Sequence, residues 1–216
     1  MLSALGVKLD ITPEAAARCL AETGIVFMFA PKHHLSMKHA IGPRQEIGIR
    51  TIFNILGPLA NPALADAQVM GVFAPDLTEK LGEVLLNLGV KRGFVVHGGD
   101  GMDEITLTDY TKITEIKDQK TRTYYLKPEE LGLERTTLSE LKGGDTAENA
   151  DIIKKILSGK LPGPKTDIVL LNAAAAIVAG GLAEDLGEGL LLARRSLESG
   201  KALHKLDELI RVSTLN

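Results

Sequence analysis

A strand, a helix and a second strand follow one another between residues 67 and 98, and this unit limits what the chain can fold into. The stretch AQVMGVFA (67–74) is apolar and is bounded by an aspartate and a proline, as expected for a central strand. DLTEKLGEVLLNLGV (76–90) then places apolar residues at helical spacing, and RGFVVHG (92–98) predicts the next strand. Such a connection joins parallel strands through a crossover helix, so the sequence indicates an α/β fold.

The segments around this unit also predict helices and strands. Thr12-Pro13-Glu14 has the capping hydroxyl, the proline and the acid of a helix start, and IVFMFAP (25–31) predicts a buried strand. Residues 105–126 alternate polar and apolar side chains, which is typical of an antiparallel ribbon, with a turn at Asp118-Gln119. DIVLLNAAAAIVAG (167–180) predicts a strand that leads into a helix, and the remaining C-terminal segments are expected to be helical.

The composition agrees with one packed domain over residues 1–216, an α/β fold with a mixed, largely parallel central sheet flanked by helices. Hydrophobic residues make up 44% of the 216 and charged residues 25%, which is the globular norm. The net charge is −3 and basic residues do not gather in one segment, which argues against a nucleic-acid partner. The single cysteine, Cys19, excludes an intrachain disulfide and is expected to be buried. Without a membrane-spanning run or a signal peptide, a soluble cytoplasmic protein is expected.

Two adjacent acids, Asp103 and Glu104, follow the second strand of the unit in VVHGGDGMDEITLT (95–108). They could lie in a solvated loop, because acid pairs are common. They could also bind a cation, because ligands of open α/β sheets bind beyond the carboxyl ends of the strands. Two carboxylates suit Mg²⁺, which is usually held by one or two acids together with water and phosphate. Gly98, Gly99 and Gly101 would leave room there for a ligand.

Two other segments allow more than one interpretation. KGGDTAENADII (142–153) resembles a phosphate loop, but Asp145 and Glu148 have the spacing of a helix cap and its third residue, which favours a plain helix start. The histidines of KHH (32–34) and His39 could be surface or core residues rather than ligands of a substrate. No GxSxG elbow supports a nucleophilic serine.

Arg44 and Arg50 lie in GPRQEIGIR (42–50), a segment shaped by glycine and proline. An arginine in such surroundings is suited to clamp a carboxylate or a phosphate, because its planar fork donates two parallel hydrogen bonds. An ion pair with Glu46 is the alternative.

Taken in order, several segments resemble anthranilate phosphoribosyltransferase, and together they span essentially all of the chain. They are FMFAPKHHLSMKHAIGPRQEIGIRTIFNILGPLANP (27–62), VVHGGDGMDEIT (95–106), GGDTAENADIIKKILSG (143–159) and DIVLLNAAAAI (167–177). The resemblance implies a catalytic domain like those of nucleoside phosphorylases and phosphoribosyltransferases. It also implies a step of tryptophan biosynthesis, in which anthranilate displaces pyrophosphate from C1 of phosphoribosyl pyrophosphate (PRPP) with the help of Mg²⁺.

The resemblance also implies roles for individual residues. Asp103 and Glu104 match the acid pair that holds Mg²⁺ against PRPP. Arg44 matches the arginine that binds anthranilate, whereas Arg50 does not and is expected to be structural. We therefore expect Arg44 and the acid pair to face a common cleft. No proton transfer is assigned to any residue, because the aniline nitrogen is already a neutral nucleophile.

Three further positions correspond to the tunnel through which the aromatic substrate passes. His34 and Pro58 line this tunnel in the resemblance, and Met37 lies near the same wall. These residues are expected to shape the acceptor site and to orient the substrate.

Two motifs of the family, GTGGD and KHGN, cradle PRPP upstream of the matching segments, and neither occurs in this chain. The chain is therefore expected to represent the C-terminal, larger α/β portion of the enzyme and to self-associate, the whole enzyme being a homo-oligomer. It is expected to bind PRPP poorly and to turn over negligibly unless another chain supplies the missing part. Three alternatives stay open: a pyrimidine nucleoside phosphorylase, a paralogue with another carboxylate-bearing acceptor, and an inactive or partner-dependent fragment.

Overall fold

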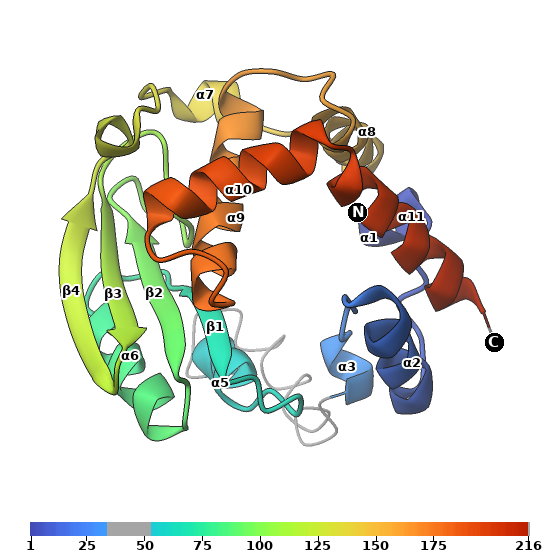
Figure 1. Cartoon of the computed structure of the whole chain (residues 1–216), viewed down its shortest axis with the longest axis horizontal. Helices are drawn as coiled ribbons and strands as arrows, with labels where there is room; N and C mark the ends of the chain where they lie inside the picture. The colour runs from blue at the N-terminus through green and yellow to red at the C-terminus, as the bar shows by residue number, and fades with distance from the viewer. Residues whose placement is uncertain (34–52, 216) are drawn as a thin grey trace. The chain divides into compact units, whose positions relative to one another are not determined.

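The computed structural model describes residues 1–33 and 53–215 (Figure 1). The chain falls into two compact units. The sheet unit comprises Leu64–Lys142 and Lys160–Glu198, and the helical unit comprises Met1–Ala63, Gly143–Gly159 and Ser199–Asn216. The expectation that all 216 residues form a single domain stays a prediction.

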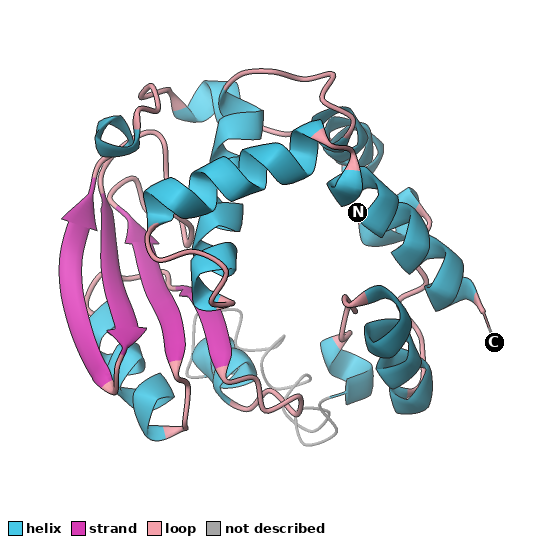
Figure 2. Ribbon diagram, viewed as in Figure 1, coloured by secondary structure: helices cyan, strands magenta, loops and turns pink. Residues whose placement is uncertain are grey.

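The sheet unit contains one mixed sheet (Figure 2). Its strands are β1 (Ala67–Gly71), β2 (Arg92–Gly98), β3 (Thr111–Lys117) and β4 (Lys120–Leu126), and they lie in the order β1-β2-β3-β4. The β1–β2 pair is parallel and is joined through helix α6 (Leu77–Asn87), as the strand–helix–strand pattern predicts. The β2–β3 and β3–β4 pairs are antiparallel.

The α/β class with a mixed sheet flanked by helices is confirmed, but the balance of strand directions differs from expectation. Of the three pairs in the described sheet, one is parallel and two are antiparallel, so these strands do not form a largely parallel sheet. The chain reverses direction twice, in the loop 99–110 between β2 and β3 and in the β3–β4 hairpin, which turns through Asp118 and Gln119. Both residues have positive φ, 53° and 57°, as a tight two-residue hairpin requires.

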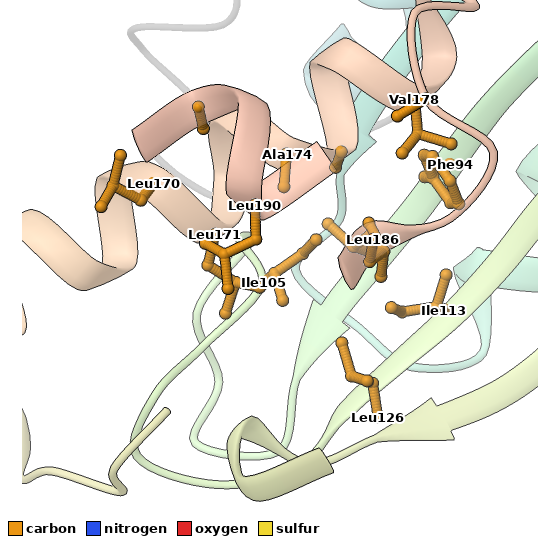
Figure 3. Close-up of a cluster of buried hydrophobic side chains, with 14 of the residues drawn as sticks. Phe94, Ile105, Ile113, Leu126, Leu170, Leu171, Ala174, Val178, Leu186 and Leu190 are labelled. Atoms are coloured by element: carbon orange, nitrogen blue, oxygen red, sulfur yellow. The ribbon is translucent and has the colours of Figure 1, made fainter. Parts of the chain in front are cut away.

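Helices cover both faces of the sheet because successive strand side chains point to opposite sides. Phe94 and Val96 of β2 join a buried cluster with α9 (Pro164–Ala179) and α10 (Leu186–Glu198) (Figure 3). On the opposite face, α6 approaches β3 closely, since a Cβ added to Gly82 would lie 2.6 Å from the methyl group of Thr114. Helices thus cover both faces of β2, whereas β3 and β4 also line a cavity of about 520 Å³ through Glu115, Arg122 and Tyr124.

The described elements of the helical unit are helices. They are α1 (Leu2–Leu5), α2 (Pro13–Thr23), α3 (Ala30–His33), α5 (Phe53–Leu59), α8 (Thr146–Leu157) and α11 (Lys201–Thr214). The α2 helix begins as predicted, with the Thr12 hydroxyl accepting a hydrogen bond from the Ala15 amide. Cys19 is completely buried between α2 and α11, as expected, and burial raises the pKa of its thiol.

The strand predicted over residues 25–31 is wrong. Residues 25–29 have no regular structure, and Ala30 begins α3. A strand needs a neighbouring strand to receive its backbone hydrogen bonds, and all the strands among the described residues belong to the sheet unit. Instead, the Phe27 and Phe29 rings stack with their centroids 6.4 Å apart.

The strand predicted at the start of residues 167–180 is also wrong, because these residues lie in the single helix α9 up to its end at Ala179. One face of this helix is buried, through Leu171, Ala174, Ala175 and Val178, which are all 0% exposed, but apolar residues also lie outside that face, such as Val169, which is 41% exposed. A helix that is apolar all round has no amphipathic period, and periodicity alone cannot distinguish it from a buried strand. No helix within the described ranges is long and apolar enough to cross a membrane.

Candidate functional site

The acid pair lies in the loop Gly99–Tyr110 between β2 and β3, here called the acid loop. Because β1 and β2 are parallel, their carboxyl ends meet at the same edge of the sheet, and the acid loop folds over that edge. The contact is intimate, since a Cβ added to Gly71, the last residue of β1, would lie 1.7 Å from the carbonyl oxygen of Asp103. Only glycine permits this approach, which places Asp103 and Glu104 where α/β sheets bind ligands.

The carboxylates of Asp103 and Glu104 are exposed and carry no compensating charge. Among the described residues, neither forms an ion pair or a side-chain hydrogen bond. Partial desolvation by the surrounding protein raises the pKa of Glu104, and the negative charges of Asp103 and Asp100 add to this effect. A cation would relieve this repulsion, so the two carboxylates fit a hard divalent ion such as Mg²⁺.

Asp100 has a different task, because hydrogen bonds within the loop occupy its carboxylate. One oxygen accepts from the hydroxyl of Thr106 at 2.6 Å and from that of Thr108, and the other accepts from the Met102 amide at 3.0 Å. Burial alone would raise the pKa of Asp100, but these hydrogen bonds outweigh it and hold the pKa below its ordinary value. Asp100 therefore braces the loop from inside. Across the described ranges, no group of three or more His, Cys, Asp or Glu is placed to hold a metal ion.

The expectation that three glycines leave room for a ligand is corrected at two of them. A Cβ on Gly98 would lie 2.5 Å from a carboxylate oxygen of Asp100, and one on Gly99 would lie 3.0 Å from the ring of Tyr110. The loop itself fills the space beside both glycines. Gly101 has open space around it and a φ of +91°, so it is needed for the turn of the backbone.

The backbone after the acid pair is held by Asn172 of α9. Its side-chain oxygen accepts a hydrogen bond from the Ile105 amide at 3.0 Å, and its nitrogen donates to the Ile105 carbonyl at 2.8 Å. The Thr106 amide donates to the hydroxyl of Thr111 at 3.0 Å. These bonds replace ladder hydrogen bonds, which explains why the antiparallel ribbon begins at Thr111 and not at the predicted residue 105.

Pro58 lies in α5 and lines a cavity of about 300 Å³ within the helical unit. The wall of the cavity is largely apolar, and its polar residues are His33 and Asn61. The lining residues are Met28, Ala30, His33, Gly57, Pro58, Asn61 and Pro62. The Nε2 atom of His33 is buried and has no hydrogen-bond partner among the described residues. The cavity could accept an apolar ring with one polar substituent.

The other predicted substrate-binding residues, His34, Met37 and Arg44, lie outside the described residues. Their roles, and the common cleft expected for Arg44 and the acid pair, stay predictions. Arg50, Glu46 and His39 lie in the same undescribed range.

The helix-start interpretation of residues 142–153 is confirmed. Asp145 caps α8 by accepting hydrogen bonds from the amides of Ala147 and Glu148, at 2.8 and 2.9 Å. The Glu148 carboxylate accepts from the Asp145 amide at 2.8 Å, which completes the reciprocal cap.

Sequence reasoning missed two groups that shape the acid loop, Asp100 with its threonines and Asn172. A signal existed for each. Asp100 precedes a glycine and has two threonines within eight residues, which suits a loop closed by side-chain hydrogen bonds. Asn172 is an amide set between leucines and alanines, and such a residue on a buried helix needs polar partners.

The sequence is similar to known proteins over most of its length. Residues 1–203 match the family described as glycosyl transferase family, a/b domain. Anthranilate phosphoribosyltransferase from Geotalea uraniireducens is 56% identical over 213 residues, which cover 99% of this chain and 61% of that protein. The chain thus spans about three fifths of the length of this relative.

Solved structures of proteins with the same name superpose well. The crystal structure from Thermus thermophilus has a TM-score of 0.92 and 42% identity, covering 99% of this chain and 63% of that one. A Saccharomyces cerevisiae structure in complex with PRPP and Mg has a TM-score of 0.89 and 28% identity, with coverages of 99% and 61%. Since the family match extends over nearly the whole sequence, this chain belongs to the glycosyl transferase family and matches its a/b domain.

Proposed function

We propose that this chain forms the metal-binding and acceptor-binding α/β part of an enzyme that transfers the phosphoribosyl group from PRPP to anthranilate. The products are N-(5-phosphoribosyl)anthranilate and pyrophosphate, and the step belongs to tryptophan biosynthesis. The observation that carries the proposal is the uncompensated acid pair at the carboxyl edge of β1 and β2. The relatives that share 52–56% of its residues bear the name of this activity, although the chain covers only part of their length.

Asp103 and Glu104 would hold Mg²⁺ on the side of the loop that faces solvent. The bound ion would neutralise the negative charge that gathers on the departing pyrophosphate. The protein's own contribution is to present two carboxylates from a braced backbone, without a lysine or arginine to compete for them among the described residues. The yeast relative solved with PRPP and Mg supports this choice of ion.

The acceptor would enter through the cavity at Pro58, which offers apolar walls to an aromatic ring. His34 and Met37 would extend this wall, and Arg44 would receive the carboxylate of anthranilate in a bidentate pair. Because aniline nitrogens are neutral nucleophiles, the site needs to orient the amine rather than to deprotonate it.

The remaining parts of the proposal concern the setting of the protein. We infer a cytoplasmic enzyme that forms homo-oligomers and that has no nucleic-acid or membrane partner. Sedimentation at several concentrations tests the oligomer, and a concentration-independent monomer would contradict it.

Isothermal titration tests the binding proposals. PRPP should bind to the chain weakly and only when Mg²⁺ is present, and the Asp103→Asn, Glu104→Gln variant should lose this binding. Benzoate is a matched control for anthranilate, since it offers the carboxylate but no amine; it should bind competitively and give no product by mass spectrometry. PRPP binding that ignores both Mg²⁺ and the acid pair would overturn the proposal.

A further inference from the structure

We propose that Asn172 is a positioning residue for the acid pair: from helix α9 it fixes the backbone at Glu104 so that both carboxylates are presented to a divalent cation. This inference rests on the proposed function, because it assigns a supporting residue to the metal site proposed there. Asn172 touches neither substrate nor cation in this account, and it acts through the peptide groups on either side of Ile105.

Both polar atoms of the Asn172 side chain form hydrogen bonds. Its oxygen accepts from the Ile105 amide at 3.0 Å, while its nitrogen donates to the Ile105 carbonyl at 2.8 Å and to the Ile168 carbonyl at 3.0 Å. One side chain thus joins both backbone groups of a loop residue, 67 positions away in the sequence, to a carbonyl of its own helix. The side chain has no freedom to rotate without breaking all three hydrogen bonds.

This clamp acts directly on Glu104. The amide of Ile105 belongs to the peptide group that links Glu104 to Ile105, so holding that amide fixes the backbone on the carboxyl side of Glu104. On the amino side, the carbonyl of Asp103 lies against Gly71 at the end of β1. Glu104 is therefore held by rigid elements on both sides, and the side chains of both acids stay exposed.

The buried side chain of Ile105 also fixes the acid loop at this residue. It is 0% exposed and belongs to the buried cluster that contains Leu171 and Leu190 (Figure 3). Burial of Ile105 alone would satisfy packing but would leave its backbone groups unpaired, since this part of the loop is not in a strand. Asn172 of α9 supplies those partners, although leucine or alanine at this position would favour the helix more.

A purely structural role is the competing interpretation, in which Asn172 stabilises the loop but does not affect cation binding. The two interpretations differ in one measurable quantity, the affinity for Mn²⁺, a probe for Mg²⁺ that is detected by electron paramagnetic resonance. Groups that orient metal ligands without touching the metal typically change affinity by about ten- to a hundredfold.

The experiment compares the full 216-residue chain with three variants. Asn172→Leu removes the clamp while keeping the number of side-chain heavy atoms and their branching at Cγ. Thr123→Val is the matched control, because it deprives the buried Thr114 hydroxyl of its 2.9 Å partner elsewhere in the sheet unit. Asp103→Asn, Glu104→Gln removes the carboxylates themselves. Unfolding in urea measures the stability of each variant, and hydrogen exchange reports on the Ile105 amide.

We expect Asn172→Leu to weaken Mn²⁺ binding about tenfold and to accelerate exchange at Ile105, while Thr123→Val leaves the affinity within about twofold at comparable loss of stability. If Asn172→Leu does not fold, Asn172→Ser serves instead, since a serine hydroxyl is too short to bridge both Ile105 groups; the same weakening is expected. Unchanged Mn²⁺ affinity in the folded variant, or equal weakening in Thr123→Val, would overturn the positioning role.

The acid-pair variant separates this inference from the proposed function. If the unaltered chain binds Mn²⁺ and the acid-pair variant does not, the metal site stands, and the result for Asn172→Leu then decides the inference. If the unaltered chain does not bind Mn²⁺, or if removing both carboxylates changes nothing, the metal site fails and the inference fails with it.

Discussion

Acidic residues at the two edges of the β1–β2 pair have opposite electrostatic surroundings. At the amino edge, the Lys91 ammonium donates a hydrogen bond to the Asp66 carboxylate at 2.9 Å. This hydrogen bond and the positive charge of Lys91 lower the pKa of Asp66. At the carboxyl edge, Asp103 and Glu104 have no basic partner among the described residues, and the pKa of Glu104 is raised.

Asp66 therefore stabilises the fold, whereas Asp103 and Glu104 are available to bind a ligand. Lys91 also donates its amide to the Asp66 carbonyl at 2.7 Å, so the amino edge is closed by the chain itself. At the other edge, the chain braces the backbone through Asn172 and Gly71 but leaves the charges uncompensated. Groups with pKa values perturbed in this direction, at an edge where sheets bind ligands, are typical of functional sites.

The largest effect should come from removing the charges at the carboxyl edge. Asp103→Asn, Glu104→Gln should weaken Mn²⁺ binding by at least roughly a hundredfold, since even groups outside the first coordination sphere contribute up to about that factor. Asp66→Asn, at the amino edge, should leave Mn²⁺ affinity unchanged. Equal losses in the two variants, measured by electron paramagnetic resonance, would show that the edges do not differ.

The next effect concerns the backbone at each edge. Gly71→Ala places a methyl group against the Asp103 carbonyl, and Gly93→Ala places one 2.3 Å from the Gln68 carbonyl. Both should lower the free energy of unfolding by roughly 1–3 kcal/mol, because the neighbouring backbone must shift. Only Gly71→Ala should also weaken Mn²⁺ binding. If Gly93→Ala weakens it equally, the effect belongs to sheet stability and not to the acid loop.

The smallest effect is a pH dependence of opposite sign at the two edges. The folded-state pKa of Glu104 lies above its ordinary value of 4.5, so the folded state loses stability as the pH rises through this region. The folded-state pKa of Asp66 lies below its ordinary value of 3.8, so its stabilisation is present above that pH and is lost as the pH falls through the folded-state pKa.

Urea unfolding between about pH 3 and pH 7 tests these signs. At neutral pH, Glu104→Gln should be more stable than the unaltered chain, and Asp66→Asn should be less stable. Both differences should shrink at the acidic end of the range. A stabilising Asp66→Asn change at neutral pH would contradict the assignment of the ion pair.

Local chemistry made much of this fold predictable. The strand–helix–strand unit, the cap at Thr12, the reciprocal cap at Asp145 and the turn at Asp118-Gln119 each depend on neighbouring residues, and the structure confirms them. The position of the acid pair beyond β2 followed from the same unit, because a parallel pair fixes which edge its carboxyl ends share.

What could not be predicted depends on contacts between distant residues. Apolar residues lie all round α9 and hide its helical period, and the apolar run at residues 25–29 lacks a strand to pair with. The clamp from Asn172 to Ile105 spans 67 positions, and only the packing of α9 against the face of the sheet brings the two together.

The central claim is that the uncompensated acids at the carboxyl edge bind a divalent cation. Paramagnetic broadening of amide signals by substoichiometric Mn²⁺ tests it most directly, because the effect falls steeply with distance from the bound ion. We predict that the signals of residues 102–106 disappear first, while those of Asp66 and Lys91 keep their intensity. Preferential broadening at Asp66, or uniform broadening over the whole chain, would contradict it.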